Sequence, residues 1–325
     1  MPSTNSTISR PNLPPGLKEY YEIRSYFGTT VWIHCFYDDK VDMSSAAKAC
    51  WQKADLIQSY MNVYAEPREG NLSWLNKAGT QGIRVQEDIF KLLKHALAYC
   101  RLTDGAYDVT IFPLVQLWKN AAKEGRLPDK KLVESVKDQV GYQNVVLQGP
   151  DLVFFMKKGM MIDLGSPASG YFCDEVAAIL DAHGIRHFMV DGGGELFCRG
   201  KNRGEIPWSV GVQDPFNKDK IFTAIDLQDK GISTSGNYEK FSTIGTEKFA
   251  HIIDPRTGYP QKGAASVTVV AETTQAANEL STALCVMGGR KGLEFIRSLK
   301  NVEALIIENQ NDKIVEYRSR AFEKN

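Results

Sequence analysis

The chain has 325 residues, of which 43% are hydrophobic and 24% are charged, enough for one large domain or two modest ones with a sizeable core. Its 39 Lys and Arg residues balance its 39 Asp and Glu residues. This balance excludes a net electric field that would draw the whole molecule to nucleic acid or to an anionic membrane, so we expect neither partner.

The amino terminus and the cysteines bear on the expected compartment. Residues 1–18 are rich in Ser, Thr, Asn and Pro, without the apolar run of a secretory signal, and no later stretch is long enough to span a bilayer. The six cysteines are scattered, form no C-x-x-C pair and are expected to be reduced core thiols. We therefore expect a cytoplasmic protein with a flexible polar tail at residues 1–18.

The chain after this tail starts with strands and continues with helices. Strands at 20–27 and 30–37 are predicted to form a hairpin that turns at Gly28. Apolar residues at helical spacing, with Pro near helix starts and Gly at helix ends, predict four helices, at 44–60, 85–102, 129–140 and 174–183.

Short strands fill much of the remaining chain. They are predicted at 145–147, 152–156, 160–162, 187–190, 196–198, 208–212 and 222–227. Most are too close together for a crossover helix, which favours antiparallel pairing. The last third adds a strand at 266–270, helices at 274–287 and 291–299, and strands at 303–307 and 313–317. Because no repeat and no shift in composition marks a boundary, residues 19–325 are predicted to form one α+β domain.

Residues 251–260 hold the densest group of reactive side chains in the sequence. His251, Asp254, Arg256 and Thr257 stand among two prolines and a glycine, which forbid regular structure. Such residues on a stiff loop are typical of an active site. They also suit a well-made turn, since Asp can cap it and Gly258 can take a positive φ. The decapeptide alone leaves both interpretations equally open.

Four other segments carry groups that suit ligand binding. Residues 104–110 contain Asp108, and residues 163–171 run from a strand to a helix start, where free N–H groups can hold a phosphate. Three consecutive glycines in 191–195 allow the backbone to approach a ligand closely. Residues 231–239 offer hydroxyls, a glycine and an aromatic ring. A turn, a helix cap or a β-bulge would explain each segment alone.

The predicted helix 274–287 adds Asn278 and Thr282, which are four residues apart on one face and can offer two oxygens to one ligand. A solvated polar face is the simpler explanation. The common patterns of nucleotide-binding and hydrolytic enzymes are absent, including G-x-x-x-x-G-K-[ST], G-x-G-x-x-G after a strand, G-x-S-x-G and H-E-x-x-H. A ligand site in this chain would therefore belong to another class.

Taken in order, these segments resemble the ApbE family, the FAD:protein FMN transferases. The matching patterns are D-G-x-[FY]-D-[VI]-T…P-L-V…L-W in 104–118, D-L-G-x-x-A-x-G-Y in 163–171, G-G-G-E in 192–195, S-x-S-G-x-Y-E in 233–239, H-I-I-D-P-R-T-G-x-P in 251–260 and L-x-T-A-L-x-V-M-G in 280–288. Upstream, F-G-T-T at 27–30 is similar to the family's M-G-T-x, and M-N-V-Y at 61–64 to its M-S-x-[FY].

The resemblance implies an α+β ApbE-like domain, with largely antiparallel or mixed sheets flanked by helices and an FAD cleft between sub-lobes. It implies binding of FAD and of Mg²⁺ at the diphosphate. The implied reaction moves FMN from FAD onto a Thr of a client flavoprotein and releases AMP, while some relatives hydrolyse FAD to FMN and AMP. Phosphoryl transfer of this kind needs charge neutralisation and positioning more than covalent help from the protein.

The resemblance also implies roles for individual residues. The Ala168 carbonyl, the Asn278 side chain and the Thr282 hydroxyl would hold the metal. His251 would be the base or orienter of the attacking hydroxyl, with Asp254 as its partner. The residues expected to face FAD are Phe27, Tyr64, Asp108, Ser169, Gly193, Glu195, Ser235, Gly236, Tyr238 and His251.

Three positions depart from the family pattern and leave a second interpretation open. Asn278 stands where relatives usually have Asp, Ser169 where they usually have Lys, and Phe27 where they have Met. A neutral amide is a poorer Mg²⁺ ligand than a carboxylate, and Ser169 removes a positive charge near the diphosphate. The alternative to an active transferase is therefore an FAD-binding ApbE-like protein with weakened or lost transfer.

Overall fold

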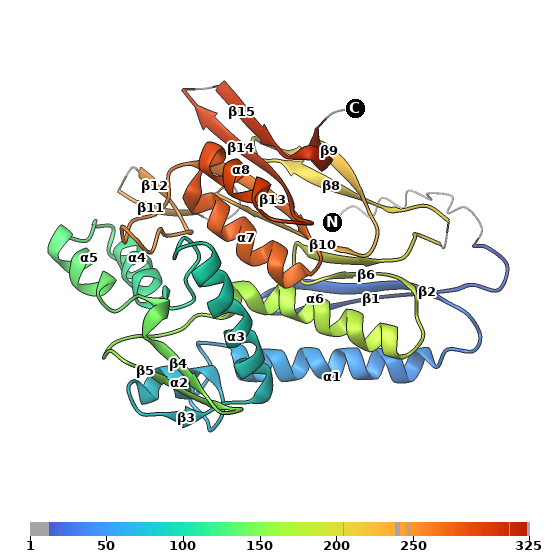
Figure 1. Ribbon diagram of the computed structural model, residues 1–325, viewed down its shortest axis with the longest axis horizontal. Helices are drawn as coiled ribbons and strands as arrows, with labels where there is room; N and C mark the ends of the chain where they lie inside the picture. The colour runs from blue at the N-terminus through green and yellow to red at the C-terminus, as the bar shows by residue number, and fades with distance from the viewer. Residues whose placement is uncertain (1–12, 204, 238–240, 246, 312, 324–325) are drawn as a thin grey trace.

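The structure, a computed structural model, describes residues 13–203, 205–237, 241–245, 247–311 and 313–323. Its centre is an eight-stranded sheet in which every neighbouring pair is antiparallel (Figure 1). The strand order is β1 (Lys18–Tyr26), β2 (Thr29–Tyr37), β6 (His187–Asp191), β7 (Glu195–Arg199), β10 (Lys230–Gly236), β13 (Ala264–Ala271), β14 (Glu303–Gln310) and β15 (Lys313–Arg318). The predicted α+β fold with largely antiparallel strands is confirmed.

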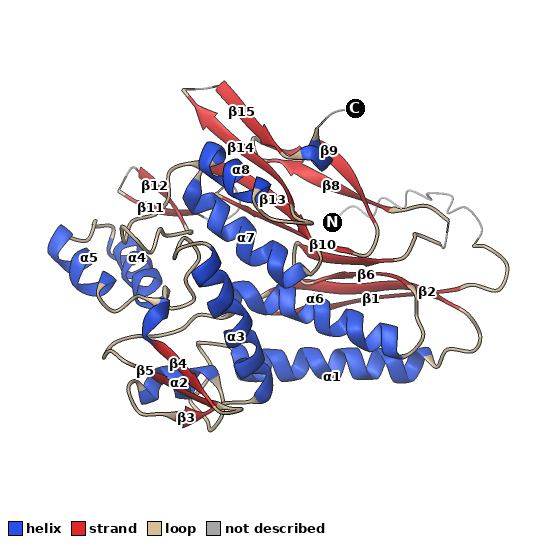
Figure 2. Cartoon of the chain, viewed as in Figure 1, coloured by secondary structure: helices blue, strands red, loops and turns tan. Residues whose placement is uncertain are grey.

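Both faces of this sheet are covered, as the alternation in β2 requires. Val31 and Ile33 are buried on one side, and Phe36 is buried in a separate cluster on the other. The first side packs on the helices α1 (Met43–Met61), α6 (Gly165–Ala182) and α7 (Thr274–Met287), which lie along the sheet in Figure 2. The second side packs on the hairpin of β8 (Trp208–Asp214) and β9 (Asn217–Leu227). The core is therefore split between the two faces.

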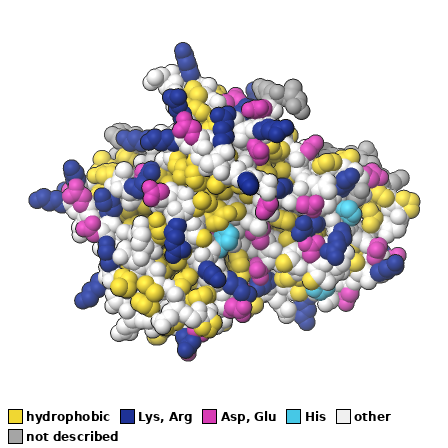
Figure 3. Space-filling view, in the orientation of Figure 1, with side chains coloured by type: hydrophobic (Ala, Val, Ile, Leu, Met, Phe, Trp, Pro, Cys, Tyr) yellow, Lys and Arg dark blue, Asp and Glu magenta, His cyan; other side chains and the backbone are white. Residues whose placement is uncertain are grey.

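Smaller elements surround these layers. They are the helices α2 (Leu72–Ala78), α3 (Glu87–Leu102), α4 (Phe112–Glu124), α5 (Lys130–Lys137) and α8 (Gly289–Arg297), a sheet of β3 (Ile83–Arg84), β5 (Leu152–Phe155) and β4 (Val145–Gln148), a hairpin of β11 (Phe241–Ile244) and β12 (Glu247–Ala250), and short 3-10 turns at Tyr142–Asn144 and Arg320–Phe322. None of the described helices is long and apolar enough to cross a membrane. Positive and negative side chains are interspersed over the face shown in Figure 3, as the balanced composition predicts.

The largest difference from the predicted elements is the start of α6. The sequence predicts a helix from residue 174, but α6 begins at Gly165. Gly165, Pro167 and Gly170 are loop signals, yet Pro is tolerated in a first helical turn. Gly170 is needed for packing, because a Cβ there would lie 2.9 Å from the Cα of Gln275 in α7. The glycine is thus a contact between two helices, which no local pattern reveals.

Other differences are smaller. The predicted strand at 160–162 is wrong, since Met161 forms only an isolated bridge with Ile111. Helices α2 and α4 were not predicted. In α4 the apolar run 111–118 carries Pro113 in the first turn, where its missing N–H costs nothing. The division between a tail at 1–18 and a domain at 19–325 stays a prediction, and residues 1–12 lie outside the described residues.

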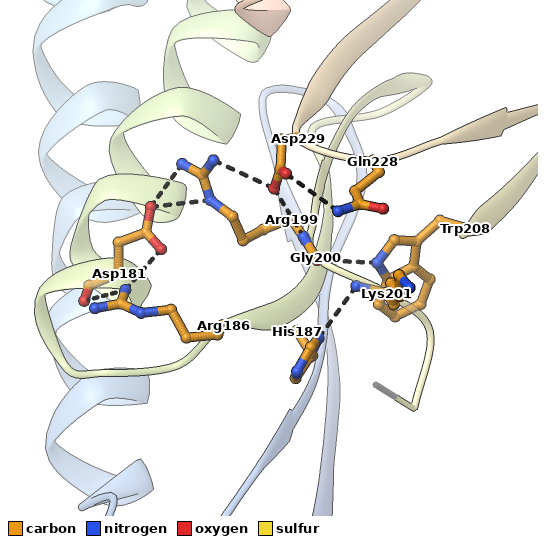
Figure 4. A network of polar contacts seen from close by, with 9 residues as sticks. All are labelled: Asp181, Arg186, His187, Arg199, Gly200, Lys201, Trp208, Gln228 and Asp229. Atoms are coloured by element: carbon orange, nitrogen blue, oxygen red, sulfur yellow. Dashed lines mark hydrogen bonds and ion pairs between the residues drawn. The ribbon is translucent and has the colours of Figure 1, made fainter. Parts of the chain in front are cut away.

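A polar network fastens the carboxyl end of α6 to the sheet (Figure 4). Arg199 of β7 donates to Asp181 of α6 at 2.6 Å and to Asp229 at 3.4 Å. Arg186 donates to the same Asp181 carboxylate at 2.9 Å. These bonds fix the carboxyl end of α6 relative to β7.

Candidate active site

A cleft of about 800 Å³ lies where the predicted site segments converge. This volume is in the upper part of the ~300–1,000 Å³ range of small-molecule sites. The lining comes from the β1–β2 turn, residues 106–111, α4, the start of α6, the β6–β7 turn, β10, the loop after β12, and α7. The predicted site residues in this lining are Phe27, Asp108, Ser169, Gly193, Glu195, Ser235, Gly236, His251, Asn278 and Thr282.

Four predicted residues are not in the lining. Ala168 is buried in the first turns of α6, between lining residues. Tyr64 is 64% exposed, and its hydroxyl accepts a hydrogen bond of 2.6 Å from Lys119, which does line the cleft. Asp254 belongs to the 251–260 loop, between lining residues. Tyr238 lies outside the described residues.

The turn between β6 and β7 forms one wall and depends on its glycines. Gly193 has a φ of +108°, and a Cβ there would lie 2.3 Å from a methyl group of Thr29. A Cβ on Gly192 would lie 2.6 Å from the backbone oxygen of Ser169 in α6. Asp191 closes the turn by accepting a hydrogen bond from the Gly193 N–H. The two glycines therefore let the turn pack against Thr29 and α6, and residues 192–194 all line the cleft.

Three side chains from α6, α7 and β7 form a chain of hydrogen bonds along the cleft. The Ser166 hydroxyl donates to the Asn278 amide oxygen at 2.9 Å, and the Asn278 amide nitrogen donates to Glu195 at 2.9 Å. An ionised carboxylate only accepts, so Glu195 determines the orientation of the amide. Asn278 is 2% exposed and gives Glu195 a donor at a point where Asp would bring a second carboxylate.

Hydroxyl groups continue this wall. The Thr282 hydroxyl donates to the backbone oxygen of Asn278 at 3.1 Å and lies 3.5 Å from the Ser235 hydroxyl. Ser235 in turn lies 2.8 Å from the hydroxyl of Ser281. Because Thr282 uses its proton on the helix backbone, its oxygen lone pairs remain for a ligand.

The start of α7 is held by a side chain of α6. Asp174 accepts hydrogen bonds from the backbone N–H groups of Thr274 at 2.8 Å and of Gln275 at 2.9 Å. Burial raises the pKa of Asp174 to about 6, although these N–H groups favour the ionised form. This cap fixes the register in which Asn278 faces Ser166.

Two further acids border the cleft. Asp108 accepts from the Thr110 N–H at 2.8 Å, the Thr110 hydroxyl at 2.7 Å and the Tyr142 N–H at 3.0 Å. Burial raises its pKa, and burial also raises the pKa of Asp163 against the opposing charge of Lys119. Three local donors therefore hold the Asp108 carboxylate in place at the cleft, and its contact with FAD stays a prediction.

The 251–260 loop is a stiff hairpin held by α4. Asp254 pairs with Arg256 through two bonds of 2.9 Å, and its backbone oxygen accepts from the Gly258 N–H at 2.8 Å. The indole N–H of Trp118 donates to the Gly258 oxygen at 2.9 Å. His251 is exposed and lines the cleft. The structure thus gives Asp254 a partner in Arg256, and assistance from Asp254 to His251 stays a prediction.

Phe27 reaches the cleft from a strained turn. Its φ is +56°, which is uncommon for a residue other than glycine. Its N–H donates to Gln58 at 3.0 Å, and its ring packs edge-on against Phe172 of α6 at 5.5 Å. These contacts hold an aromatic ring at the position where the family pattern has Met.

Sequence reasoning missed Ser166, Trp118 and Lys119 as site residues. Ser166 occupies a variable position of its motif, so no pattern could assign it. A helix predicted at α4 would have pointed to Lys119. Ile111, Val115 and Lys119 are four residues apart, so a helix brings them to one face, and all three line the cleft.

Comparison with known proteins decides the family. The model of the ApbE family matches residues 27–306, which is most of the chain. The chain belongs to the ApbE family. The FAD:protein FMN transferase of Haemophilus influenzae is 30% identical over 310 residues, covering 91% of this chain and 88% of the relative. That of Escherichia coli K12 is 30% identical over 245 residues, covering 73% and 70%.

Solved ApbE structures share the fold. The ApbE protein from Thermotoga maritima has a TM-score of 0.83 and 29% identity, covering 94% of this chain and 98% of its own. The flavin transferase ApbE from Vibrio cholerae has a TM-score of 0.82 and 26% identity, with the same coverage. The expected family and its fold are therefore confirmed.

The predicted metal ligands suit a hard cation. Among the described residues, no three His, Cys, Asp or Glu side chains are grouped to hold a metal. The expected donors are oxygens, from the Ala168 carbonyl, the Asn278 amide and the Thr282 hydroxyl, with the Glu195 carboxylate beside Asn278. Mg²⁺ prefers oxygen ligands and takes several of them from substrate phosphates and water. The donor set fits Mg²⁺, with fewer charges than a carboxylate at residue 278 would provide.

Proposed function

We propose that the protein is an FAD:protein FMN transferase that moves FMN from FAD onto a Thr of a client flavoprotein and releases AMP. The observation that carries the proposal is the convergence of the family's motif segments, distant in sequence, on one cleft of about 800 Å³. Support also comes from relatives at 30% identity that are FAD:protein FMN transferases.

In the proposed reaction, the client's threonine oxygen bonds to the phosphorus of the FMN half as the bond to the AMP oxygen breaks. His251, exposed at the cleft, takes the proton of the attacking hydroxyl. The glycine turn 192–194 and the start of α6 offer backbone to the diphosphate. The Asp254–Arg256 pair and Trp118 keep the loop that carries His251 in place.

The proposal includes a magnesium ion held by the Ala168 carbonyl, the Asn278 amide and the Thr282 hydroxyl. When bound, the ion would neutralise charge on the diphosphate. Around it, Ser166 and Glu195 hold the Asn278 amide in one orientation through bonds of 2.9 Å each. We also place the reaction in the cytoplasm, supported by six buried cysteines that are all free thiols.

A second candidate function is FAD binding without transfer. The hydrogen bond between Asn278 and Glu195 favours it, because the amide gives one oxygen of this carboxylate a donor without any metal. Hydrolysis of FAD to FMN and AMP is the version of the first function in which water replaces the client.

The test is incubation of the protein with FAD and Mg²⁺, with and without a client that bears a D-G-x-[ST]-G-A-T acceptor. Transfer gives AMP and flavin fluorescence that stays with the client on a denaturing gel. AMP without a fluorescent client indicates hydrolysis. FAD binding with neither product supports the second candidate and refutes the proposal. A client with Ala at the acceptor Thr is the matched control.

A further inference from the structure

The cleft has an unusual balance of charge for a site that binds a dinucleotide. In the part of the chain that the structure describes, Lys119 is the only Lys or Arg in the lining. Three carboxylates, Asp108, Asp163 and Glu195, line the same cleft. The diphosphate of FAD is anionic, so its binding here needs a cation close by.

Lys119 is placed and partnered so that it can serve as this cation. Its ammonium donates to the Tyr64 hydroxyl at 2.6 Å and lies 5.1 Å from the centre of the Tyr64 ring. An ammonium has three donors, so two remain after the bond to Tyr64. The Tyr64 hydroxyl accepts this bond and keeps its own proton to donate. The Lys119 ammonium therefore presents its remaining donors to an acceptor in the cleft, with the Tyr64 hydroxyl beside it.

The position of Lys119 relative to α6 supports the same role. Asp163, whose carboxylate accepts from the first N–H of α6 at 2.8 Å, feels the positive charge of Lys119. Lys119 therefore lies near the amino-terminal end of α6, where the helix dipole also favours an anion. Ser169 is on this same helix and also lines the cleft.

We infer that Lys119, together with Tyr64, binds a phosphate of FAD and supplies the positive charge that the carboxylates of the lining cannot provide. The inference rests on the proposed function for the identity of the ligand. It also explains how Tyr64, which is outside the lining, can contact FAD.

The test compares Lys119→Gln with Lys123→Gln, which removes an exposed charge one turn further along α4 and outside the lining. FAD affinity and riboflavin affinity are measured by titration, without metal and with Mg²⁺, at several salt concentrations. Riboflavin lacks the phosphates but keeps the flavin ring. Thermal unfolding of each variant checks that the fold is intact.

Loss of a charge-assisted hydrogen bond predicts that Lys119→Gln weakens FAD binding by about ten- to a hundred-fold. Riboflavin binding should change less than about two-fold, and the salt dependence of FAD binding should decrease. Lys123→Gln should match the parent, Lys119→Arg should retain most affinity, and Tyr64→Phe should lose part of it.

The outcomes separate this inference from the proposed function. If Lys119→Gln binds FAD as tightly as the parent while the parent transfers FMN, the inference is wrong and the function stands. If Lys119→Gln weakens FAD binding in a parent that transfers nothing, the inference stands and the function is wrong. Equal loss of FAD and riboflavin binding would show that Lys119 contacts the flavin ring, against the inference. A parent that binds no FAD overturns both.

Discussion

Replacing Asn278 by Asp tests whether the amide at this position stabilises the fold when no metal is bound. The amide nitrogen of Asn278 lies 2.9 Å from a Glu195 oxygen, and Asn278 is 2% exposed. In Asn278→Asp a donor becomes an acceptor, so two carboxylates face each other. At that separation, 2.9 Å, two unit charges repel by roughly 6 kcal/mol with an effective dielectric constant of 20, before relaxation.

Relaxation and protonation will remove much of this repulsion. One of the two carboxylates can keep its proton, as in other close carboxylate pairs. The lost charge-assisted hydrogen bond alone is worth about 1.5–3 kcal/mol. We therefore expect Asn278→Asp to lower the free energy of unfolding by about 2–3 kcal/mol at pH 7 without metal. Lowering the pH or adding Mg²⁺ should restore most of it, since either one neutralises the pair.

The chain offers a control with the same chemistry in water. Asn301 donates to Glu272 at 2.8 Å on the surface, and both residues are exposed. Asn301→Asp should change the unfolding free energy by less than about 1 kcal/mol, and Mg²⁺ should not affect this change. Urea unfolding of both variants and the parent, with and without Mg²⁺, makes the comparison.

Two results would refute the reasoning about Asn278. One is an Asn278→Asp protein as stable as the parent at pH 7 without metal, which would mean that Glu195 does not depend on the amide. The other is that Mg²⁺ changes the unfolding free energy of Asn278→Asp and that of the parent by the same amount. If the second candidate function is correct, Asn278→Asp should also gain metal-dependent AMP release, more so when combined with Ser169→Lys.

Three other perturbations test the remaining parts of the site. His251→Ala should slow FMN transfer at saturating FAD by about 10²–10⁴-fold, and a variant as fast as the parent would remove His251 from the mechanism. Trp118→Phe breaks the 2.9 Å bond to the Gly258 oxygen and should cost about 1 kcal/mol of stability and lower the transfer rate at saturating FAD; unchanged stability and rate would contradict a holding role. The pKa of Asp174 is raised to about 6, so its neutral form stabilises the fold below about pH 4 and this contribution is lost as the pH rises through 6. The stability of the parent minus that of Asp174→Asn should therefore fall by about 3 kcal/mol between pH 4 and pH 8, and a difference that does not vary with pH would contradict the raised pKa.

The sequence predicted well those elements whose pattern is local. The alternation of Val31, Ile33 and Cys35 in β2 and the helical spacing of apolar residues in α3 both match the buried positions. The start of α6 could not be predicted in this way. Gly170 allows α6 to pack closely against α7. Only the assembled fold shows that the two helices are too close for a side chain at this position.

The same distinction holds for the site. The motifs named residues that do line one cleft, but they carry no information on which side chains are hydrogen-bonded to one another. Asp254 is hydrogen-bonded to Arg256, which the motif does not indicate, and its assistance to His251 stays a prediction. Lys119 lies just beyond the end of a motif. Its proposed role in binding FAD depends on the carboxylates that surround it in the folded protein.

Charge arithmetic across the cleft explains why two departures from the family pattern can occur together. Asn278 in place of Asp removes one negative charge, and Ser169 in place of Lys removes one positive charge, so the formal charge of the lining is the same as in the family pattern. Among the described residues, Lys119 is then the only Lys or Arg of the lining that can offset its three carboxylates. What changes is the charge at residue 278, where a neutral amide keeps an oxygen for Mg²⁺ while its nitrogen donates to Glu195 at 2.9 Å. FAD affinity should consequently depend on Lys119, and the effect of Mg²⁺ on the protein should depend on Asn278. Mutation can therefore separate the two properties.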